Sequence, residues 1–476
     1  MGSHSVFGQA GFQPVAGGVA VQGGAQGGVQ GNVQGGVQGG AQGNVQGNVQ
    51  GGGAGGIQID AQGVVTPKFS KLKSGQLNQA VLDAFAKKFI NEDVNVTSPL
   101  RKVSLVRLEA AIEECLNTKK PVPPEMQFLA GIQRIDYVFL DPESKDLVIA
   151  GPAEGFAMDD LGRVVGVSNR RPPLRLDDLM VALRALQKQG ALGCSIDAED
   201  SRMTKFQQYV KANSTRTTPA GVVQRYKNMA TILGMQNISV WGVPADSHFG
   251  YTLVEADWRM KRLSLDLENP QVRDFRSHLA MVGRGGNATQ RFWFMPLYDA
   301  FEQNEGGTAF HFAGQRAQLM SQEEYVSESG KRFDAPTTRV STQRFAKHFT
   351  DKFPELAESM PVFAELQNTI DLAILAALFK KERLPQKIGW RMSLFLDSER
   401  ATYATTNAPK QVASVVNYRK AGRGMVVGLI GGGVVINAMD TIRAIEFKTD
   451  EAERVEGIRA GAFEKPHPEQ HPWWWD

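Results

Sequence analysis

A short, uncharged repeat near the start of the chain sets the strongest limit on what it can fold into. From Val21 to Gly52 the tetrapeptide Val/Ala-Gln-Gly-Gly/Asn occurs eight times in succession. Its sparse valines cannot offset an ordering entropy of about 1–2 kcal/mol per residue. Between Met1 and Thr66 the only formally charged side chain is Asp60. We therefore predict a disordered arm over residues 1–56.

The arm has two interpretations. It is either an inert linker or a segment that associates with itself or with a surface, because uncharged Gln/Asn-rich repeats pair through their side-chain amides. The repeat does not decide between them.

Composition limits the rest of the chain. Its 476 residues are enough for two or three domains, since single cores stop growing near about 250–300 residues. The 53 basic and 50 acidic side chains leave a net charge of only +3. A protein that binds phosphates usually carries a broad positive field. Nucleic acid is therefore a poor candidate for a partner.

Cysteine content and hydropathy bear on the compartment. Cys115 and Cys194 are too few for a disulfide framework, and we read them as small buried side chains or, in an exported protein, as one disulfide. The apolar runs Asp371–Phe379 and Gly424–Met439 are shorter than the ~20 residues of a membrane span. Met1–Ser5 lacks a signal-like start. The localisation is unknown: exported if a signal has been removed, and otherwise cytoplasmic.

Local patterns predict a mixed α+β (α/β) fold. Helices are predicted over Leu77–Phe89, Leu105–Leu116, from Asp177 as N-cap, from Pro219 to a stop at Gly234, and over Ser341–Lys381 with breaks at Pro354 and Pro361. Strands are predicted at Ile57–Asp60, Gly63–Val65, Ile132–Leu140, Leu147–Ala150, from Cys194, and at Ile238–Val243, Trp390–Leu396, Val412–Tyr418 and Met425–Asn437.

Helix and strand alternate over the first two thirds, and the C-terminal part reads as β-rich. We place region boundaries at 57–198 (N-terminal α/β), 199–388 (central, with long helices), 389–465 (β-rich) and 466–476 (a Pro/Trp-rich tail).

Several strings resemble one family: Arg101–Glu109, Ala150–Phe156, Arg175–Leu179 with Ala182–Arg184, Trp241–Phe249 and Glu255–Arg262. Together they resemble the planctomycete family catalogued as domain of unknown function 1598, over roughly Gly56 to the closing Trp473–Asp476. The resemblance implies an origin in that bacterial group, whose members often carry an export signal. It implies no reaction, cofactor or catalytic residue.

The charged run Ala256–Arg262 is a candidate ligand site. On a helix its charged side chains would face outward, and Asp257 would pair with Lys261 four residues on. The functional alternative is a site for an anion or an acidic partner, with Arg259 and Arg262 supplying planar donors.

Two loops that follow predicted strands are the other candidates. Asp246, Ser247 and His248 lie where α/β proteins place ligand-binding loops. Adjacent Ser and His do not make a catalytic triad, and no Gly-x-Ser-x-Gly motif surrounds Ser247. Glu154 lies in the second loop, Gly151–Phe156, and is either a positioned carboxylate or part of a tight turn.

Two further motifs, for dinucleotide binding and for metal binding, do not fit the sequence. The glycines of Gly422–Gly428 suggest a dinucleotide motif, but the sequence that follows reads as strand, turn and strand instead of a helix. His467 and His471 lie among prolines, so their spacing does not define one helical face. His311 and His348 read as core or boundary residues. We predict no catalytic residue, no metal and no cofactor.

The last residues carry Trp473, Trp474 and Trp475, which indicate either a docked tail or a binding surface. The leading hypothesis is a non-catalytic structural or interaction protein that self-associates or attaches to a protein or surface through its arm and tail. One alternative is an enzyme of unrecognised class, with a pocket near Glu154, His248 and Arg259. A further alternative is a peptide- or glycan-binding module that uses the tryptophans.

Overall fold

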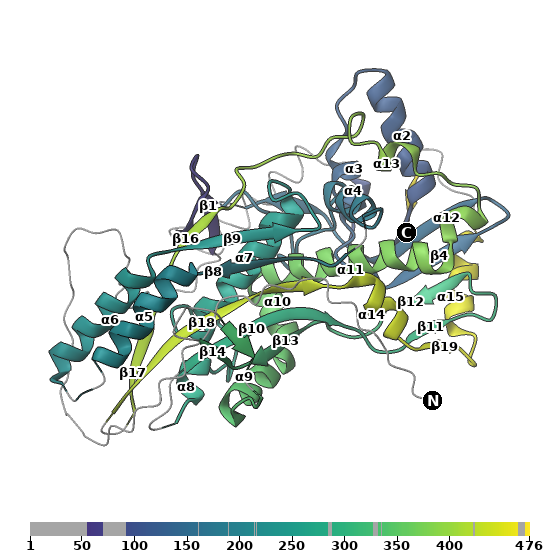
Figure 1. Cartoon of the computed structure of the whole chain (residues 1–476). Helices are drawn as coiled ribbons and strands as arrows, with labels where there is room; N and C mark the ends of the chain where they lie inside the picture. Colours follow the sequence, from purple (N-terminus) through teal and green to yellow (C-terminus); the bar gives the residue numbers. More distant parts are fainter. Residues whose placement is uncertain are drawn as a thin grey trace, which may run out of the picture.

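The computed structural model describes residues 55–69, 92–464 and 472–476, except positions 160, 189, 214, 216, 284–287, 327–331, 335 and 422–423. Figure 1 shows this part of the chain as a mixed α+β body, which confirms the predicted fold class. Residues 1–54 of the predicted arm and the predicted helix Leu77–Phe89 lie outside the described residues, as do His467 and His471. Gly55 and Gly56, the last two residues of the predicted arm, belong to the strand β1 (Gly55–Ile59).

The larger sheet has nine strands within the described residues, in the order β1-β2-β16-β9-β8-β18-β10-β13, with β17 paired to β18. It mixes parallel pairs, such as β10 with β18, and antiparallel pairs, such as β8 with β18. Its members are β1 (Gly55–Ile59), β2 (Val64–Phe69), β8 (Leu192–Asp197), β9 (Met235–Trp241), β10 (Ala288–Leu297), β13 (Arg316–Gln322), β16 (Gln411–Ala413), β17 (Asn417–Ala421) and β18 (Gly424–Ile436).

The smaller sheet joins segments from both ends of the chain, in the order β19-β11-β12-β4-β5-β3-β20. At its centre, the strands predicted at Ile132–Leu140 and Leu147–Ala150 are present as the hairpin β4–β5, with β4 beginning only at Tyr137. In the larger sheet, those predicted at Ile57–Asp60 and Gly63–Val65 form the hairpin β1–β2. Its strands are β3 (Ser98–Ser104), β4 (Tyr137–Asp141), β5 (Asp146–Ala153), β11 (Phe301–Gln303), β12 (Ala309–His311), β19 (Phe447–Thr449) and β20 (Trp474–Trp475). Two short hairpins are separate, β6 (Phe156–Met158) with β7 (Val164–Gly166) and β14 (Glu324–Val326) with β15 (Arg332–Asp334).

Two buried helices form the centre of the molecule. Helix α7 (His248–Ser264) packs against β8 and β18 on one side and against α11 (Pro361–Glu382) on the other. Every residue of α11 from Pro361 to Phe379 is buried. Among the described helices, α11 alone has the length and hydropathy to cross a membrane, yet its apolar window is entirely buried inside the protein. It serves as the core helix here.

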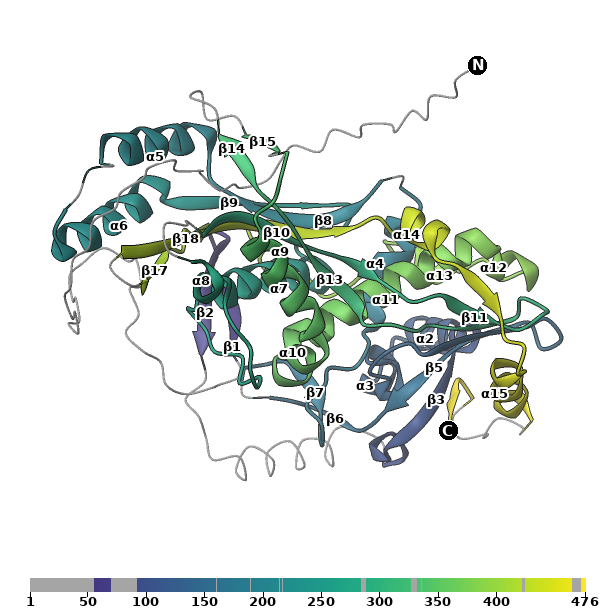
Figure 2. The same cartoon turned by 90° about the horizontal axis from the view of Figure 1, so that it is seen from below.

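The remaining helices surround this centre. The α5–α6 pair projects at one end and α12 and α15 lie at the other, in both views (Figures 1 and 2). Their bounds are α2 (Leu105–Asn117), α3 (Pro124–Gln127), α4 (Leu176–Ala185), α5 (Asp200–Ala212), α6 (Pro219–Leu233), α8 (His278–Met281), α9 (Val340–Asp351), α10 (Phe353–Ser359), α12 (Leu384–Lys387), α13 (Ser393–Leu396), α14 (Ala438–Ala444) and α15 (Arg454–Phe463).

Local signals set several of these boundaries as predicted. The Ser104 side chain accepts a hydrogen bond from the Arg107 backbone N–H at the start of α2. Helix α6 begins at Pro219, and Gly234 follows it at a φ of +59°, a conformation that favours glycine. The long helical stretch after residue 340 breaks before both prolines into α9, α10 and α11.

Other predictions for the second half are wrong. Trp390–Leu396 is not a strand, since it contains the short helix α13, and Val412–Tyr418 is divided between β16 and β17. The strand predicted at Met425–Asn437 is present as β18, but Leu429–Ile436 continues it without the predicted turn, and Asn437 lies beyond its end. The C-terminal part also contains α14 and α15. Helix α4 begins at Leu176, so Asp177 is inside it and Arg175 is the N-cap.

The tryptophan tail is docked. Trp474 and Trp475 pair with Val103 and Lys102 of β3, and the three indole side chains, from Trp473 to Trp475, are only 4–6% exposed. The prediction of an aromatic binding surface required exposed rings, and it is wrong because these rings fill the protein core. Cys115 and Cys194 are both free.

Candidate functional site

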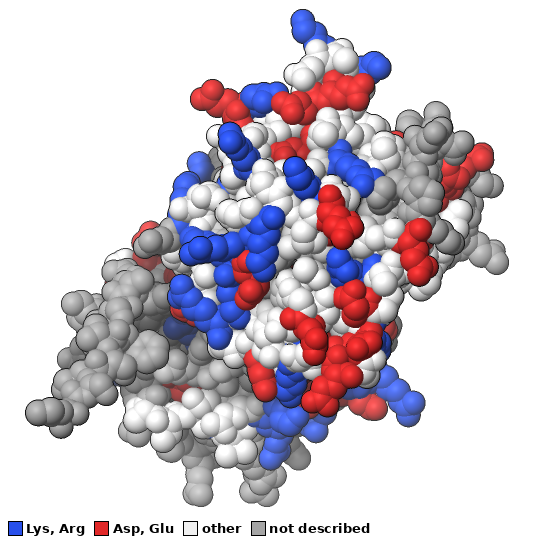
Figure 3. Space-filling view, turned by 90° about the vertical axis from the view of Figure 1, so that its right-hand side faces the viewer, with Lys and Arg blue, Asp and Glu red and all other residues white. Residues whose placement is uncertain are grey.

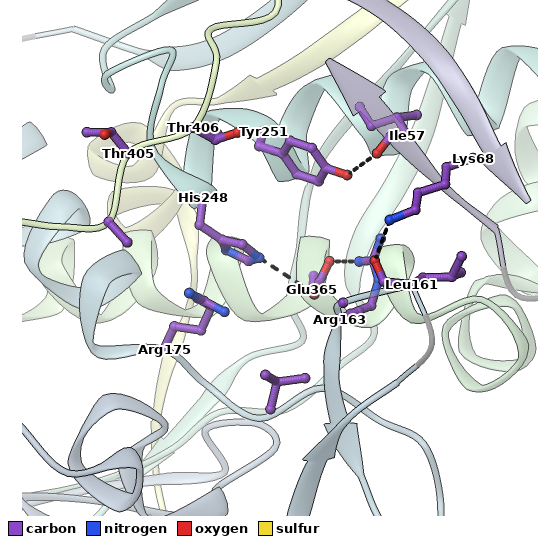
Figure 4. Close-up of a pocket in the computed structure, with 13 residues that line it drawn as sticks. Ile57, Lys68, Leu161, Arg163, Arg175, His248, Tyr251, Glu365, Thr405 and Thr406 are labelled. Atoms are coloured by element: carbon purple, nitrogen blue, oxygen red, sulfur yellow. Dashed lines mark hydrogen bonds and ion pairs between the residues drawn. The ribbon is translucent and has the colours of Figure 1, made fainter. Parts of the chain in front are cut away.

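A polar pocket lies where α4, α7 and α11 meet the β1–β2 hairpin (Figure 4). Its volume is about 260 Å³. We call it the His248 pocket. The residues that line it are Ile57, Lys68, Leu161, Gly162, Arg163, Val164, Arg175, His248, Tyr251, Glu365, Ala404, Thr405 and Thr406.

His248 is the first residue of α7 and lies between two carboxylates. The Ser247 hydroxyl caps the helix by accepting from the Gly250 backbone N–H at 3.1 Å, which sets the direction in which the chain enters α7. His248 Nδ1 lies 2.8 Å from Oδ2 of Asp178 on α4. Its Nε2 lies 3.6 Å from Oε1 of Glu365 on α11, beyond hydrogen-bond distance.

Burial determines the charge of this imidazole. It lowers the pKa of His248 below its usual value, although the Asp178 carboxylate acts in the opposite direction. The neutral form is therefore favoured near neutral pH. An ionised carboxylate can only accept hydrogen bonds, so the Nδ1–H donates to Asp178 and the lone pair is on Nε2. Asp178 thus orients the imidazole so that Nε2 can act as a base.

Arg163 neutralises the carboxylates behind the imidazole. Its guanidinium bonds to Glu365, and its Nη2 lies 2.7 Å from Oε2 of Glu255. The pKa of Arg163 is raised because Glu255 and its other neighbours outweigh the desolvation that burial causes. Glu255 lies in turn 3.7 Å from Nε of Arg259. Arg163 is thus held within the scaffold, although it lines the pocket.

Two further cations line the pocket with unused hydrogen-bonding capacity. Arg175 lies over the Phe128 ring at 5.1 Å, and its Nη2 is 4.0 Å from Oδ2 of Asp177. Its buried Nε makes no hydrogen bond within the described part of the chain. Lys68 donates one hydrogen bond, to the Leu161 carbonyl at 3.2 Å. Figure 4 places Arg175 beside His248 and Lys68 across the pocket from them.

Tyr251 also lines the pocket, and its hydroxyl donates to the Ile57 carbonyl at 2.9 Å. Burial and the neighbouring Glu255 carboxylate raise the pKa of Tyr251 well above its usual value. It is therefore a neutral donor, anchored to the β1–β2 hairpin.

An extended segment, residues 402–406, forms one edge of the pocket. The Ala404 backbone N–H donates to Asp177 at 3.3 Å, and that of Thr406 donates to the Asp246 carbonyl at 2.9 Å. The Tyr403 hydroxyl lies 3.1 Å from Oδ1 of Asp246. Asp246 therefore holds this segment in place and does not line the pocket.

The structure does not bring the predicted pocket residues together. Of Glu154, His248 and Arg259, only His248 lines the His248 pocket. The Glu154 carboxylate is buried and accepts hydrogen bonds from the Gln133 and Ser168 side chains and from the Asn169 backbone N–H. The prediction of a pocket near all three residues is wrong.

The charged face of α7 is also not a surface site. The predicted pair is present, with Asp257 Oδ2 3.0 Å from Lys261 Nζ, but both residues are buried. Arg259 and Arg262 are 2% and 6% exposed and both bind Glu268. The outward face and the anion site predicted for this run are both wrong, because α7 is covered by the large sheet and by α11.

The sequence prediction missed Arg163, Arg175, Asp178, Tyr251 and Glu365. One signal was available: Glu365 is a carboxylate within the most apolar helical stretch of the chain, where an ionised group requires a partner. The other missed residues carry no such signal, because they reach the pocket from segments that are far apart in the sequence. Within the described residues, no group of three or more His, Cys, Asp or Glu side chains has metal-binding geometry.

One face of the molecule carries side chains of both charges (Figure 3). Figure 3 shows separate groups of basic and acidic side chains on one face of the molecule. Exposed basic residues at the end of α11 and beyond include Lys380, Arg383, Lys387 and Arg391. This face does not present a uniform field of one sign.

Fold and site define a mixed α+β protein with a polar, His-containing pocket at the ends of its central helices. Residues 194–278 match the family model described as "Protein of unknown function (DUF1598)", which confirms the family resemblance over that segment. The match runs from β8 to α8 and includes His248 and all of α7. Comparison with curated proteins and with solved structures gave no match.

Proposed function

We propose that this protein binds a small anionic molecule in the His248 pocket and that neutral His248 accepts a proton from it. The observation that carries the proposal is the Asp178–His248 hydrogen bond, which leaves Nε2 of the imidazole facing the cavity. Asp178 and Glu365 lie on the two sides of the ring. Both carboxylates would stabilise the imidazolium that forms when the proton is taken up.

The charge of the ligand follows from the cations of the pocket. Arg163 pairs with Glu255 and Glu365, whereas the Arg175 guanidinium reaches Asp177 only at 4.0 Å and Lys68 donates one hydrogen bond within the described residues, so both have donors for a ligand. A guanidinium recognises carboxylate or phosphate oxygens through paired hydrogen bonds. Ligand pockets usually measure roughly 300–1,000 Å³, so a cavity of about 260 Å³ fits a molecule of few atoms.

Binding is tested by thermal unfolding with a panel of inorganic phosphate and short carboxylic acids. At least one anion should raise the melting temperature, and Arg175→Gln should abolish that rise. Arg391→Gln is the matched control, because Arg391 is exposed and does not line the pocket. If Arg175→Gln responds to every anion as the parent protein does, the binding proposal is wrong.

The proton-acceptor role is tested separately by carbethoxylation, which modifies neutral imidazoles. His248 should react at neutral pH and be protected by the anion found in the first experiment, as measured by mass spectrometry of its peptide. His311 is the internal control, since it pairs with Glu302 at 3.0 Å outside the pocket. Equal protection of both histidines, or of neither, would contradict the role proposed for His248.

The interaction role predicted from the repeat arm stays a prediction, because residues 1–54 lie outside the described part. Light scattering of the full chain and of a variant that lacks residues 1–56 tests it. Loss of an assembled species on deletion would support self-association through the arm, and an unchanged mass would count against it.

A further inference from the structure

The residues from Pro472 to Asp476 lie on the sheet as a bound peptide would. Trp474 and Trp475 form β20 and add an antiparallel strand to the edge of β3. The Ser104 backbone N–H donates to the Trp473 carbonyl at 2.9 Å, and Arg107 donates to the Pro472 carbonyl at 3.3 Å. Addition of a strand to a sheet edge is a common mode of peptide recognition.

Arg101 provides a built site for the acidic side chain at the end of this peptide. Its guanidinium is 0% exposed and binds both carboxylate oxygens of Asp476, at 2.8 and 2.9 Å. The same group also donates to three backbone carbonyls outside the tail, those of Val94, Val96 and Ala130, at 2.8–3.0 Å. The carbonyls hold the guanidinium in position without help from the tail, so the anion site is preorganised.

The tryptophans add recognition on both faces of the strand. Trp474 lies under the Arg101 guanidinium at 4.6 Å and packs with Trp473 in the main core. Trp475 points to the other face, where its Nε1 donates to the Ala462 carbonyl at 2.9 Å and its ring packs near Phe463 of α15. The site thus recognises three features of the tail: its backbone, its aromatic rings and the Asp476 carboxylate.

We propose that this surface, formed by the β3 edge, Arg101 and the end of α15, is a peptide-binding site that accepts the Trp473–Asp476 tail of a second copy of this chain. Arg101 and Asp476 are 375 positions apart in the sequence, and the tail is held on β3 by noncovalent contacts. Each copy carries both the tail and the site, so a mutual exchange retains every contact and closes a two-fold dimer. This inference is independent of the His248 pocket.

The first experiment tests the site with the full chain. A protease sequence inserted within residues 465–471 allows the tail to be cut after folding. The cut tail should stay bound and exchange with an excess of fluorescent peptide that spans residues 466–476. Asp476→Asn in the peptide should weaken binding by roughly 10- to 100-fold, since it removes a charge-assisted pair. Glu469→Gln, the matched control, should bind like the parent peptide.

Two results of this experiment would overturn the peptide site: immediate loss of the cut tail with no uptake of fluorescent peptide, or equal binding of the Asp476→Asn and parent peptides.

The second experiment tests the partner. Deletion of residues 466–470 shortens the connection between α15 and the tail, and should thereby favour docking of the tail on a second copy over docking on its own site. Light scattering should then show a dimer, with tryptophan fluorescence unchanged because the rings are buried in the second copy. A monomer would overturn the proposed partner in either case: unchanged tryptophan emission would show the tail still docked on its own site, and red-shifted emission would show it released without entering a second copy.

Discussion

Nδ1 of His248 lies 2.8 Å from Oδ2 of Asp178, although the two residues are 70 positions apart in the chain. This contact gives the neutral imidazole a defined tautomer and leaves Nε2 facing the pocket.

Asp178→Asn should lower the pKa of His248 further, because the variant removes the anion that favours the imidazolium. A pH titration of the His248 ring by NMR measures the shift. Glu302→Gln, at the matched His311 pair on the surface, should leave His248 unchanged. An identical His248 titration in Asp178→Asn would show that this contact does not control the imidazole.

His278 should make the protein sensitive to acid. Its ring is fully buried against Phe292 and Phe345, and neither ring nitrogen has a hydrogen-bond partner within the described residues. Burial lowers its pKa to about 3. Between a pKa of about 6.5 in the unfolded chain and about 3 in the folded protein, only the unfolded chain is protonated. Stability therefore falls as the pH falls through this window, by about 1.4 kcal/mol per pH unit from this residue.

His278→Phe should remove that part of the pH dependence. Urea unfolding at a series of pH values, with His311→Asn as the control, measures it. The explanation fails if the variant and the parent lose stability with the same slope between pH 6 and 4.

Asp371 should be among the most sensitive positions of the core. It is completely buried on α11, where Oδ1 accepts from Arg316 at 3.1 Å and from the Tyr298 hydroxyl at 2.6 Å. Asp371→Ala leaves a buried guanidinium without this partner and should lower the free energy of unfolding by about 3–5 kcal/mol. Tyr298→Phe should lower it by about 1 kcal/mol.

Urea unfolding measures both changes, with Asp440→Ala as the control. Asp440 pairs with Arg443 at the surface, where both side chains are about two-thirds exposed, and its loss should change stability by less than about 1 kcal/mol. Equal effects of Asp371→Ala and Asp440→Ala would contradict the buried-pair argument.

Gly432 should not tolerate a side chain. A Cβ at this position of β18 would lie 2.0 Å from the Phe292 carbonyl oxygen and 3.0 Å from Asp257 Oδ1. Gly432→Ala should therefore reduce stability by about 1–3 kcal/mol or more. Gly457→Ala on α15, where a Cβ meets nothing within 4 Å, should instead increase stability by about 0.5–1 kcal/mol. Thermal unfolding of the two variants should show shifts of opposite sign.

Part of this protein could be read from its sequence. The β1–β2 and β4–β5 hairpins and the ends of α2 and α6 were predictable, because turn residues, helix caps and hydrophobic period act over a few neighbouring residues. The helix α11, within the stretch predicted over Ser341–Lys381 with a break at Pro361, was predictable for the same reason. The sequence also predicts the strand at Met425–Asn437, but its glycines indicate a turn that the continuous strand β18 does not contain.

The tertiary structure decided what those local patterns leave open. β18 is one strand because β8 and β10 pair along its sides, and Gly432 fits where Asp257 and Met260 of α7 come close. The charges of α7 are buried because sheet and helix cover both sides of it. His248 meets Asp178 and Glu365, and Arg101 meets Asp476, only after distant segments pack together. Such contacts depend on loop closure and on the burial of whole surfaces, which no short stretch of sequence encodes.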